Sequence, residues 1–464
     1  MLVSSRAFTL FVALLSSALP TARSCLFHGD SSHLARIDYR SLAAANVAAR
    51  SIHNHNREIS STPIVLQNVR VFNGTVLLPP STVVINGNLI SRTCDSCPPA
   101  KTYDAQGKTL LPGLIDAHSH PANVSHLINM TSFGVTTTVS AFCPAPEFCA
   151  SLNNHTGLTS IVSASFFATS PDSQHAKMVP PGDAALLINT STDALSFISK
   201  QVAQGADFIK LIGSAPLPGL SQGEQTALVA TSHQFGKQVV LHTSSYIAYD
   251  QGLVAGVDQI HHSTLDKPVD ARLINMFKAR NTIVCPTLTM MRAIVQQDPS
   301  ANGSYSAAAE TVTRLHQAGV PILAGTDANM QPLLPAMVPY GSSLHDELEN
   351  LVAAGLSPVE ALNAATVLPA KYFGLTDRGI IKEGMRADLL LVDGDPTTDI
   401  TAIRRITKVW VSGVEFDGGN STASSNSTAS SEPSPSTVPK SATSRLTGSA
   451  WVAAAGLLLI KLFI

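Results

Sequence analysis

The sequence predicts an α/β protein, a (β/α)8 TIM barrel inserted in a small β-sandwich that its flanking segments build. Three observations carry this prediction. Between residues 113 and 377, eight short apolar strands alternate with helical segments, over a length typical of this barrel. Segments 63–112 and 378–416 instead alternate Val, Ile and Thr with polar residues between turns, which favours β-strands. The 464 residues also suffice to bury a large core.

The elements follow one another in a simple order. The first flanking segment predicts three short strands with an Asn-Gly turn, and the last predicts two more. Because the barrel separates these two segments, we expect them to pair across it as one split β-module. The eight expected barrel strands cover residues 113–118, 135–141, 160–168, 207–212, 239–243, 259–263, 282–287 and 322–327.

Both ends of the chain predict export. Residues 1–24 combine a positive residue near the start, Arg6, with a short apolar run and small residues, which is typical of a secretory signal peptide. Residues 25–62 follow as an N-terminal extension. Residues 417–441 form a Ser/Thr/Pro-rich stalk, and residues 442–464 match a removed GPI-attachment signal. A buried N-terminal helix and a weak tail anchor are the alternatives for the two apolar ends.

We therefore expect a secreted glycoprotein with a GPI anchor, on the extracellular face of the plasma membrane or cell wall. In an oxidising compartment the cysteines favour local disulfides, 94–97 and 143–149. A formal net charge of −2 without a basic run excludes a nucleic-acid-binding protein. Eight N-x-S/T sequons support a glycosylated surface, at Asn73, Asn123, Asn129, Asn154, Asn189, Asn302, Asn420 and Asn426.

Polar residues stand at the ends of several expected strands. In a TIM barrel the carboxyl ends of the strands meet at one mouth, where the working residues lie. Imidazole and carboxylate groups suit a borderline divalent ion such as zinc. Two histidines at i and i+2 of a strand face the same side and can hold one ion. The residues concerned are His118, His120, Lys210, His242, His261, His262 and Asp327.

Lys210 lies within an apolar strand that would normally repel an ammonium group. Burial depresses the pKa of a lysine, and an amine without its extra proton can react with carbon dioxide. The resulting carbamate is an anion that can bridge two cations. The alternatives are a lysine that reaches solvent or pairs with an acid.

Other histidines are interpreted as ordinary. His155 and His175 stand in polar loop sequence and His233 on a helix, so we expect them to be solvated or structural. His345 follows the eighth expected strand, and we expect it to line the mouth.

A set of motifs resembles the amidohydrolase superfamily, and within it the imidazolonepropionase-like metal-dependent hydrolases, which include ochratoxinase and Xaa-Pro dipeptidase-type members. These motifs are LLPGLIDAHSHP, GADFIKL, VVLH, GVDQIHHS, ILAGTDA and GIIKEGMRADLLLVDGDP. His261 is a departure, because an acid is common at its position. A second departure is residues 243–246, where relatives often carry another histidine. The resemblance implies a two-metal site whose ligands are His118, His120, carboxylated Lys210, His242, His262 and Asp327.

The expected activity follows from this site. Two divalent ions, zinc by expectation, would give a bridging hydroxide near neutral pH, and Asp327 would shuttle the proton to the leaving nitrogen. The substrate would be a small molecule with an amide, peptide-like or lactam C–N bond. A mononuclear hydrolase or deaminase and a non-catalytic binding protein on the same scaffold are the alternatives. We also expect a homo-oligomer.

Overall fold

The computed structural model describes residues 38–55, 59–91, 100–180, 183–297, 303–329 and 336–418. Several predictions lie outside these residues: the signal peptide, the 94–97 disulfide, the sequons at Asn302, Asn420 and Asn426, almost all of the stalk, and the GPI signal. Among the described helices, none combines the length and the apolar character needed to cross a membrane.

The two flanking segments meet in one sheet, as expected. Its strand order is β15-β14-β13-β5-β1-β2-β3, with β4 parallel to β1. The antiparallel pairing of β5 with β13, in which Leu111 faces Leu390, joins the first segment to the last. The strands are β1 (Ile64–Val71), β2 (Ser81–Asn86), β3 (Leu89–Ser91), β4 (Lys101–Asp104), β5 (Thr109–Pro112), β13 (Leu389–Val392), β14 (Ile406–Val411) and β15 (Val414–Glu415).

Between these segments lie two parallel sheets. One has the order β6-β7-β8 and the other β12-β11-β10-β9. Seven of the eight expected strands are present, although β8 covers only the first part of segment 160–168. The strands are β6 (Leu114–Ser119), β7 (Val135–Ser140), β8 (Ser160–Ser163), β9 (Ile209–Ile212), β10 (Val239–His242), β11 (Gln259–His261) and β12 (Ile283–Cys285).

The eighth expected strand is wrong as a regular strand. Segment 322–327 makes one parallel bridge to β12 through Ile322, and Ala328 makes another to β6. In between, the Asp116 carboxylate accepts hydrogen bonds from the Thr326 backbone N–H (3.0 Å) and hydroxyl (2.7 Å). Asp327 has φ +56°, outside the extended region. The N–H groups of Thr326 and Asp327 both donate to the His118 carbonyl, and the Thr326 N–H also bonds the Asp116 side chain, so the segment joins β6 without forming a regular ladder.

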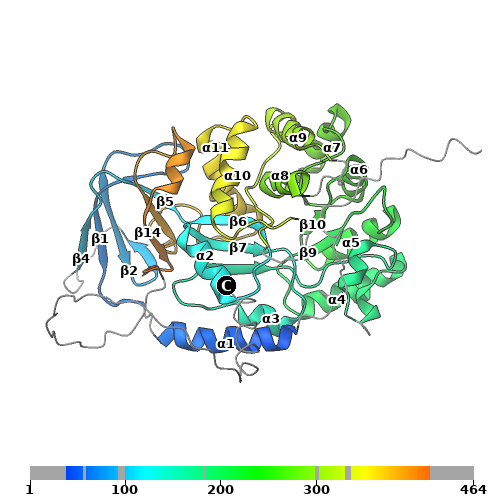
Figure 1. The fold of residues 1–464 in the computed structure, drawn as a ribbon, viewed down its shortest axis with the longest axis horizontal. Helices are drawn as coiled ribbons and strands as arrows, with labels where there is room; N and C mark the ends of the chain where they lie inside the picture. The colour runs from blue at the N-terminus through cyan, green and yellow to red at the C-terminus, as the bar shows by residue number, and fades with distance from the viewer. Residues whose placement is uncertain are drawn as a thin grey trace, which may run out of the picture. The chain divides into compact units, whose positions relative to one another are not determined.

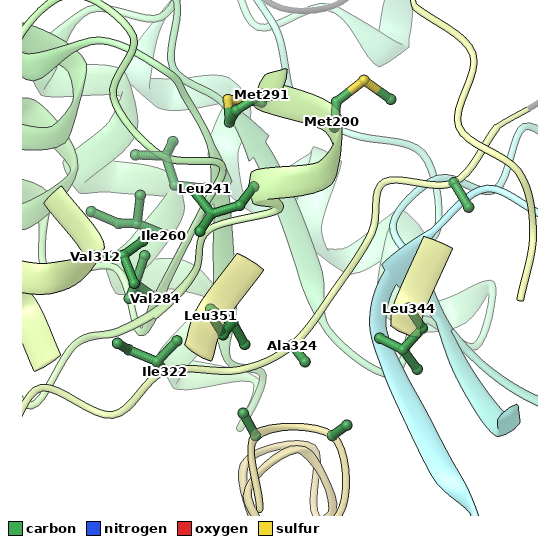
Figure 2. Packing of buried hydrophobic residues seen from close by; sticks show 14 of the residues in the cluster. Leu241, Ile260, Val284, Met290, Met291, Val312, Ile322, Ala324, Leu344 and Leu351 are labelled. Atoms are coloured by element: carbon green, nitrogen blue, oxygen red, sulfur yellow. The ribbon is translucent and has the colours of Figure 1, made fainter. Parts of the chain in front are cut away.

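Helices cover the parallel strands, and Figure 1 shows α4 to α9 gathered around β9 and β10. Leu241, Ile260 and Val284 of successive strands belong to the largest buried cluster, together with Met291 of α8 and Leu351 of α10 (Figure 2). The α-helices are α1 (Tyr39–His55), α2 (Val124–Ser132), α3 (Pro146–Ser151), α4 (Ala194–Ala203), α5 (Gln222–Gln234), α6 (Tyr246–Ala255), α7 (Ala271–Arg280), α8 (Leu288–Gln297), α9 (Tyr305–Gln317), α10 (Ser342–Ala353), α11 (Pro358–Ala364) and α12 (Val367–Tyr372).

The loop after β7 is fastened by a disulfide. Cys143 and Cys149 are bonded, which confirms that sequence prediction, whereas Cys285 is a free, buried thiol. Helix α1 lies in the expected N-terminal extension and packs on α3, where Arg50 donates to the carbonyls of Ala150 and Ser151.

Candidate metal centre

The parallel strands bring the predicted site residues together. His118 lies in β6, and His120 is the residue that directly follows this strand. His242 ends β10, and in the strand register it stands beside His261, which ends β11. Since these strands are parallel, their carboxyl ends share one edge, and the imidazoles gather there.

Three of the residues form the tightest group. Candidate ligand atoms of His118, His120 and Asp327 all lie within 4.8 Å of one another. The His120 Nε2 atom is 2.9 Å from Asp327 Oδ1, and His118 Nε2 is 3.5 Å from the same oxygen. His118 and Asp327 are fully buried, so their polar atoms face each other away from solvent.

The other imidazoles extend this group. The ring centroid of His262 lies 4.8 Å from that of His118 and 4.4 Å from that of His242. His262 Nδ1 is 3.8 Å from Asp327 Oδ2. Within the described residues, His262 Nε2 and both ring nitrogens of His242 are buried without a hydrogen bond. Buried polar atoms without partners are rare in proteins, and unprotonated nitrogens in this position suit the coordination of a metal ion.

Lys210 lies in the interior of β9, opposite Val240 of β10. Its side chain is buried, and its Nζ makes no hydrogen bond among the described residues. Burial lowers the pKa of Lys210 to about 8, against an opposing effect of the Asp327 charge. The same ammonium group acts on the pKa values of His118, His242 and His262, so it belongs to this cluster.

Burial also sets the protonation of the imidazoles. Desolvation, followed by neighbouring positive charges, lowers the pKa of His118, His242 and His262 well below the usual value. The rings are therefore neutral at pH 7, and neutral imidazole is the form that binds metal ions.

Unusual backbone angles aim two of these side chains. His262 has φ +74°, and Asp327 has φ +56°, conformations that residues other than glycine rarely adopt. Thr287, with φ +46°, places its Oγ1 atom 2.9 Å from His262 Nδ1. Such strain is typical of functional sites, where the surrounding structure holds a side chain in place.

Two residues of the site were missed by the sequence interpretation. Asp116 is buried and ties β6 to segment 322–327, since it accepts from the His118 N–H (3.1 Å) as well as from Thr326. Burial raises the pKa of Asp116 to about 7. Its place in the motif DAHSH, two residues before the first histidine, was the available signal.

The second missed residue is His175, expected in a polar loop. Of the two expectations, a solvated or a structural side chain, the solvated one is wrong, because His175 is buried with its ring centroid 5.1 Å from that of His242. Burial, and then the Lys210 charge, lowers the pKa of His175 to about 3. Its position after the third barrel strand, at the carboxyl end, was a usable signal.

The remaining histidines lie elsewhere. His345 does not line the site; it is buried in α10, where its Nε2 pairs with the carbonyl of Phe133 (2.9 Å), the residue that follows α2. That prediction is wrong because the ring packs inward against Phe133. The His155 Nε2 atom pairs with the Ser151 carbonyl, and the His233 Nε2 atom is hydrogen-bonded to the Asp258 carboxylate at the surface, so both fit the structural alternative.

The chain is similar to several known proteins. The model of the amidohydrolase family matches residues 109–415. An uncharacterized protein of Mycobacterium tuberculosis is 26% identical over 319 residues, covering 62% of this chain and 80% of that protein. An imidazolonepropionase of Deinococcus deserti is 29% identical over 198 residues, covering 41% and 44% of the two chains.

The fold has solved counterparts as well. The crystal structure of a Xaa-Pro dipeptidase with bound methionine aligns with a TM-score of 0.66 at 21% identity, covering 76% of this chain and all of that one. This likeness concerns the fold and implies a TIM-barrel architecture. The family match spans both flanking segments in part and every residue of the site, as the sequence motifs predict. The chain therefore belongs to the amidohydrolase family, hydrolases that act on carbon–nitrogen bonds.

Proposed function

We propose that this chain hydrolyses an amide, peptide-like or lactam C–N bond of a small molecule at a site for two divalent ions, with zinc as the expected metal. The observation that carries the proposal is the buried cluster of His118, His120 and Asp327, continued by unpaired imidazole nitrogens and Lys210. When bound, such ions would acidify a water molecule and polarise the scissile carbonyl.

The donor set fits these ions. Neutral imidazole nitrogens and carboxylate oxygens are the ligands that zinc prefers, and here they are buried and directed at one another. The residues proposed to hold the ions are His118, His120, Lys210, His242, His262 and Asp327.

The proposed part of Lys210 is a carbamate. With its pKa lowered to about 8, a fraction of the amine is neutral near pH 7.5. The neutral amine can attack carbon dioxide, forming an N–C bond and releasing a proton, and the product is an anion. This anion would offset the positive charge of two ions held a few ångströms apart.

Asp327 is the proposed proton carrier. Its carboxylate is buried beside His118 and His120, with Oδ1 2.9 Å from His120 Nε2 and 3.5 Å from His118 Nε2. It would take the proton of the attacking water and deliver it to the leaving nitrogen.

The architecture is part of the proposal. Isolated parallel bridges connect Ala168 to Leu211 of β9 and Ala164 to Phe208, the residue before β9. Bridges through Ile322 and Ala328 connect β12 to β6. These bridges join the two parallel sheets at both edges, which supports one (β/α)8 barrel. A two-layer β-sandwich, a homo-oligomer and a GPI-anchored, secreted form also stay predictions.

A mononuclear hydrolase or deaminase is the second candidate, because the compact group of possible ligands found among the described residues holds three side chains, enough for one ion. Metal analysis of the purified protein distinguishes the two: we expect two divalent ions per chain, whereas a mononuclear enzyme holds one. A screen of N-acyl amino acids, dipeptides and lactams then tests the reaction, with Asp327→Asn as the inactive control. Two bound ions without hydrolysis of any amide would contradict the proposed activity.

A further inference from the structure

His261, the departure from the family motif, is connected to a predicted metal ligand. Its Nδ1 lies 2.8 Å from His118 Nδ1, and its Nε2 lies 3.2 Å from Gln259 Oε1. Gln259 in turn donates from its Nε2 to Gln238 Oε1 at 2.7 Å. His118, His261 and Gln259 are all buried, so the hydrogen bonds among these three are shielded from water, whereas Gln238 is half-buried.

The direction of each hydrogen bond in this series follows from the bond between Gln259 and Gln238. Since the Gln259 amide nitrogen donates to Gln238, its oxygen Oε1 points to His261 and can only accept. His261 Nε2 must therefore carry the hydrogen. His261 is fully buried, and its two ring nitrogens face His118 and Gln259, neither of which carries a negative charge to balance a charged ring. The ring therefore holds a single proton, and Nδ1 is an acceptor. The hydrogen between the two histidines then belongs to His118 Nδ1.

We propose that His261 is a positioning residue that holds His118 as its Nδ1–H tautomer and thereby leaves the lone pair of His118 Nε2 facing Asp327. His118 Nε2 is 3.5 Å from Asp327 Oδ1, on the side of the proposed ions. The hydrogen-bonded series Gln238–Gln259–His261 thus fixes the tautomer and orientation of His118 with neutral groups. A carboxylate has this role beside many metal-binding histidines. This inference rests on the proposed function for the identity of the group that His118 Nε2 would bind.

Neutron diffraction from deuterated crystals of the purified enzyme, before and after chelation, tests the tautomer directly. We expect deuterium on His118 Nδ1 and on His261 Nε2 in both states. Deuterium on His118 Nε2 would overturn the proposal. Should the protein hold no metal while His118 still carries deuterium on Nδ1, the positioning role stands and the proposed function fails.

Zinc affinity, measured by competition with a chromophoric chelator, gives a second test with matched variants. His261→Phe keeps a ring but removes the acceptor, and we expect zinc binding to weaken about 10–100-fold. His261→Gln offers an amide oxygen to His118 and an amide N–H to Gln259, so it should stay within a few-fold of the wild type. His345→Phe, another buried histidine away from the site, is the control. Unchanged zinc affinity in His261→Phe, or weaker binding in His261→Gln than in His261→Phe, would show that only ring packing matters.

Discussion

A single buried amine decides how many ions the proposed centre can hold. Lys210 lies in a strand whose other residues, Ile209, Leu211 and Ile212, are apolar and buried. Without a carbamate, two cations would face only Asp327 as a protein anion, and their repulsion in a buried site costs several kcal/mol. The lysine is therefore the residue whose removal separates a two-ion from a one-ion site.

We expect Lys210→Ala to lower bound metal from two ions per chain toward one and to slow hydrolysis at least about a hundredfold, since even indirect partners of a ligand contribute 10–100-fold. Mass spectrometry of bound metals and initial rates measure this. Short carboxylic acids should partly rescue the rate by supplying an anion, whereas Lys210→Arg should not be active, because guanidinium keeps its proton.

Lys278→Ala, at an exposed position of α7, is the matched control for loss of a lysine. If Lys210→Ala keeps both metals and full activity, the lysine is structural and the two-ion site is wrong.

At the residue scale, the sequence predicted the side chains that its motifs contain and missed those that only folding brings near. His118, His120 and Asp327 could be predicted because strand ends of a parallel barrel meet at one edge. The position of His175 after the third barrel strand made it a candidate for the site, but its burial against His242 depends on how a long loop folds back, which the sequence pattern does not contain. His261 was recognised as a departure, but its partner His118 stands 143 residues away in the chain.

At the scale of elements, one buried carboxylate fixes the start of α8. Glu347 of α10 accepts hydrogen bonds from the Leu288 N–H (2.9 Å), the Thr289 N–H (2.7 Å) and the Thr289 hydroxyl (2.9 Å). These are the free donors at the first turn of a helix. Thr287, which contacts His262, directly precedes them, so this cap also steadies the backbone of the proposed site.

The pH dependence of the stability that Glu347 contributes shows whether its carboxyl group is protonated in the folded protein. Burial raises the pKa of Glu347 to about 7, above its ordinary 4.5, although the hydrogen bonds oppose this. Between these values the folded state binds more protons than the unfolded state, so this carboxyl's contribution to stability falls as the pH rises from 4.5 to 7. We expect the difference in unfolding free energy between wild type and Glu347→Gln to shrink over that window, in urea titrations of the chelated protein.

Because the histidines titrate in both proteins, comparing the two isolates the Glu347 contribution. Glu147→Gln, at an exposed position of α3, controls for the loss of a charge. A difference that grows with pH would mean that Glu347 is ionised in the folded protein at pH 5.

Elements were predicted where periodicity is strong. Seven barrel strands have the expected positions because each is a short run that contains Val, Ile or Leu and lies between segments of helix or turn sequence. The eighth was not regular, since Asp116 binds the Thr326 backbone, a contact that the sequence pattern of segment 322–327 does not contain.

At the scale of the whole molecule, the predicted export requires sequons that are accessible on the folded surface. Asn73, Asn129, Asn154 and Asn189 are exposed, so a glycan at any of them meets solvent. In a eukaryotic secretory host we expect glycosidase treatment to lower the mass of the protein, and phosphatidylinositol-specific phospholipase to release it from cells. Survival of the peptide 442–464 in the mature chain would contradict the GPI prediction.

The last prediction concerns cooperativity between the flanking sheet and the parallel strands. One buried cluster contains Leu390 of β13 together with Leu114 of β6 and Val135 of β7, so the two parts share a core. Gly134 lies at this contact with φ +77°, and a Cβ atom there would stand 2.7 Å from Leu390 Cδ2. Gly107 has a similar φ of +75° with no atom within 4 Å of its would-be Cβ, which makes it the matched control.

Alanine in the left-handed region costs about 1–2 kcal/mol at either position, and only Gly134→Ala adds a clash across the shared core. In a Trp451→Phe background the sole tryptophan is Trp410, buried in β14, and its fluorescence reports on the flanking sheet. Far-UV circular dichroism follows the helices around the parallel strands. Because the core is shared, we expect both signals to change at one melting temperature, and Gly134→Ala to lower that temperature more than Gly107→Ala does. Two separate transitions, with the tryptophan signal alone shifted by Gly134→Ala, would mean that the flanking sheet unfolds independently of the barrel strands.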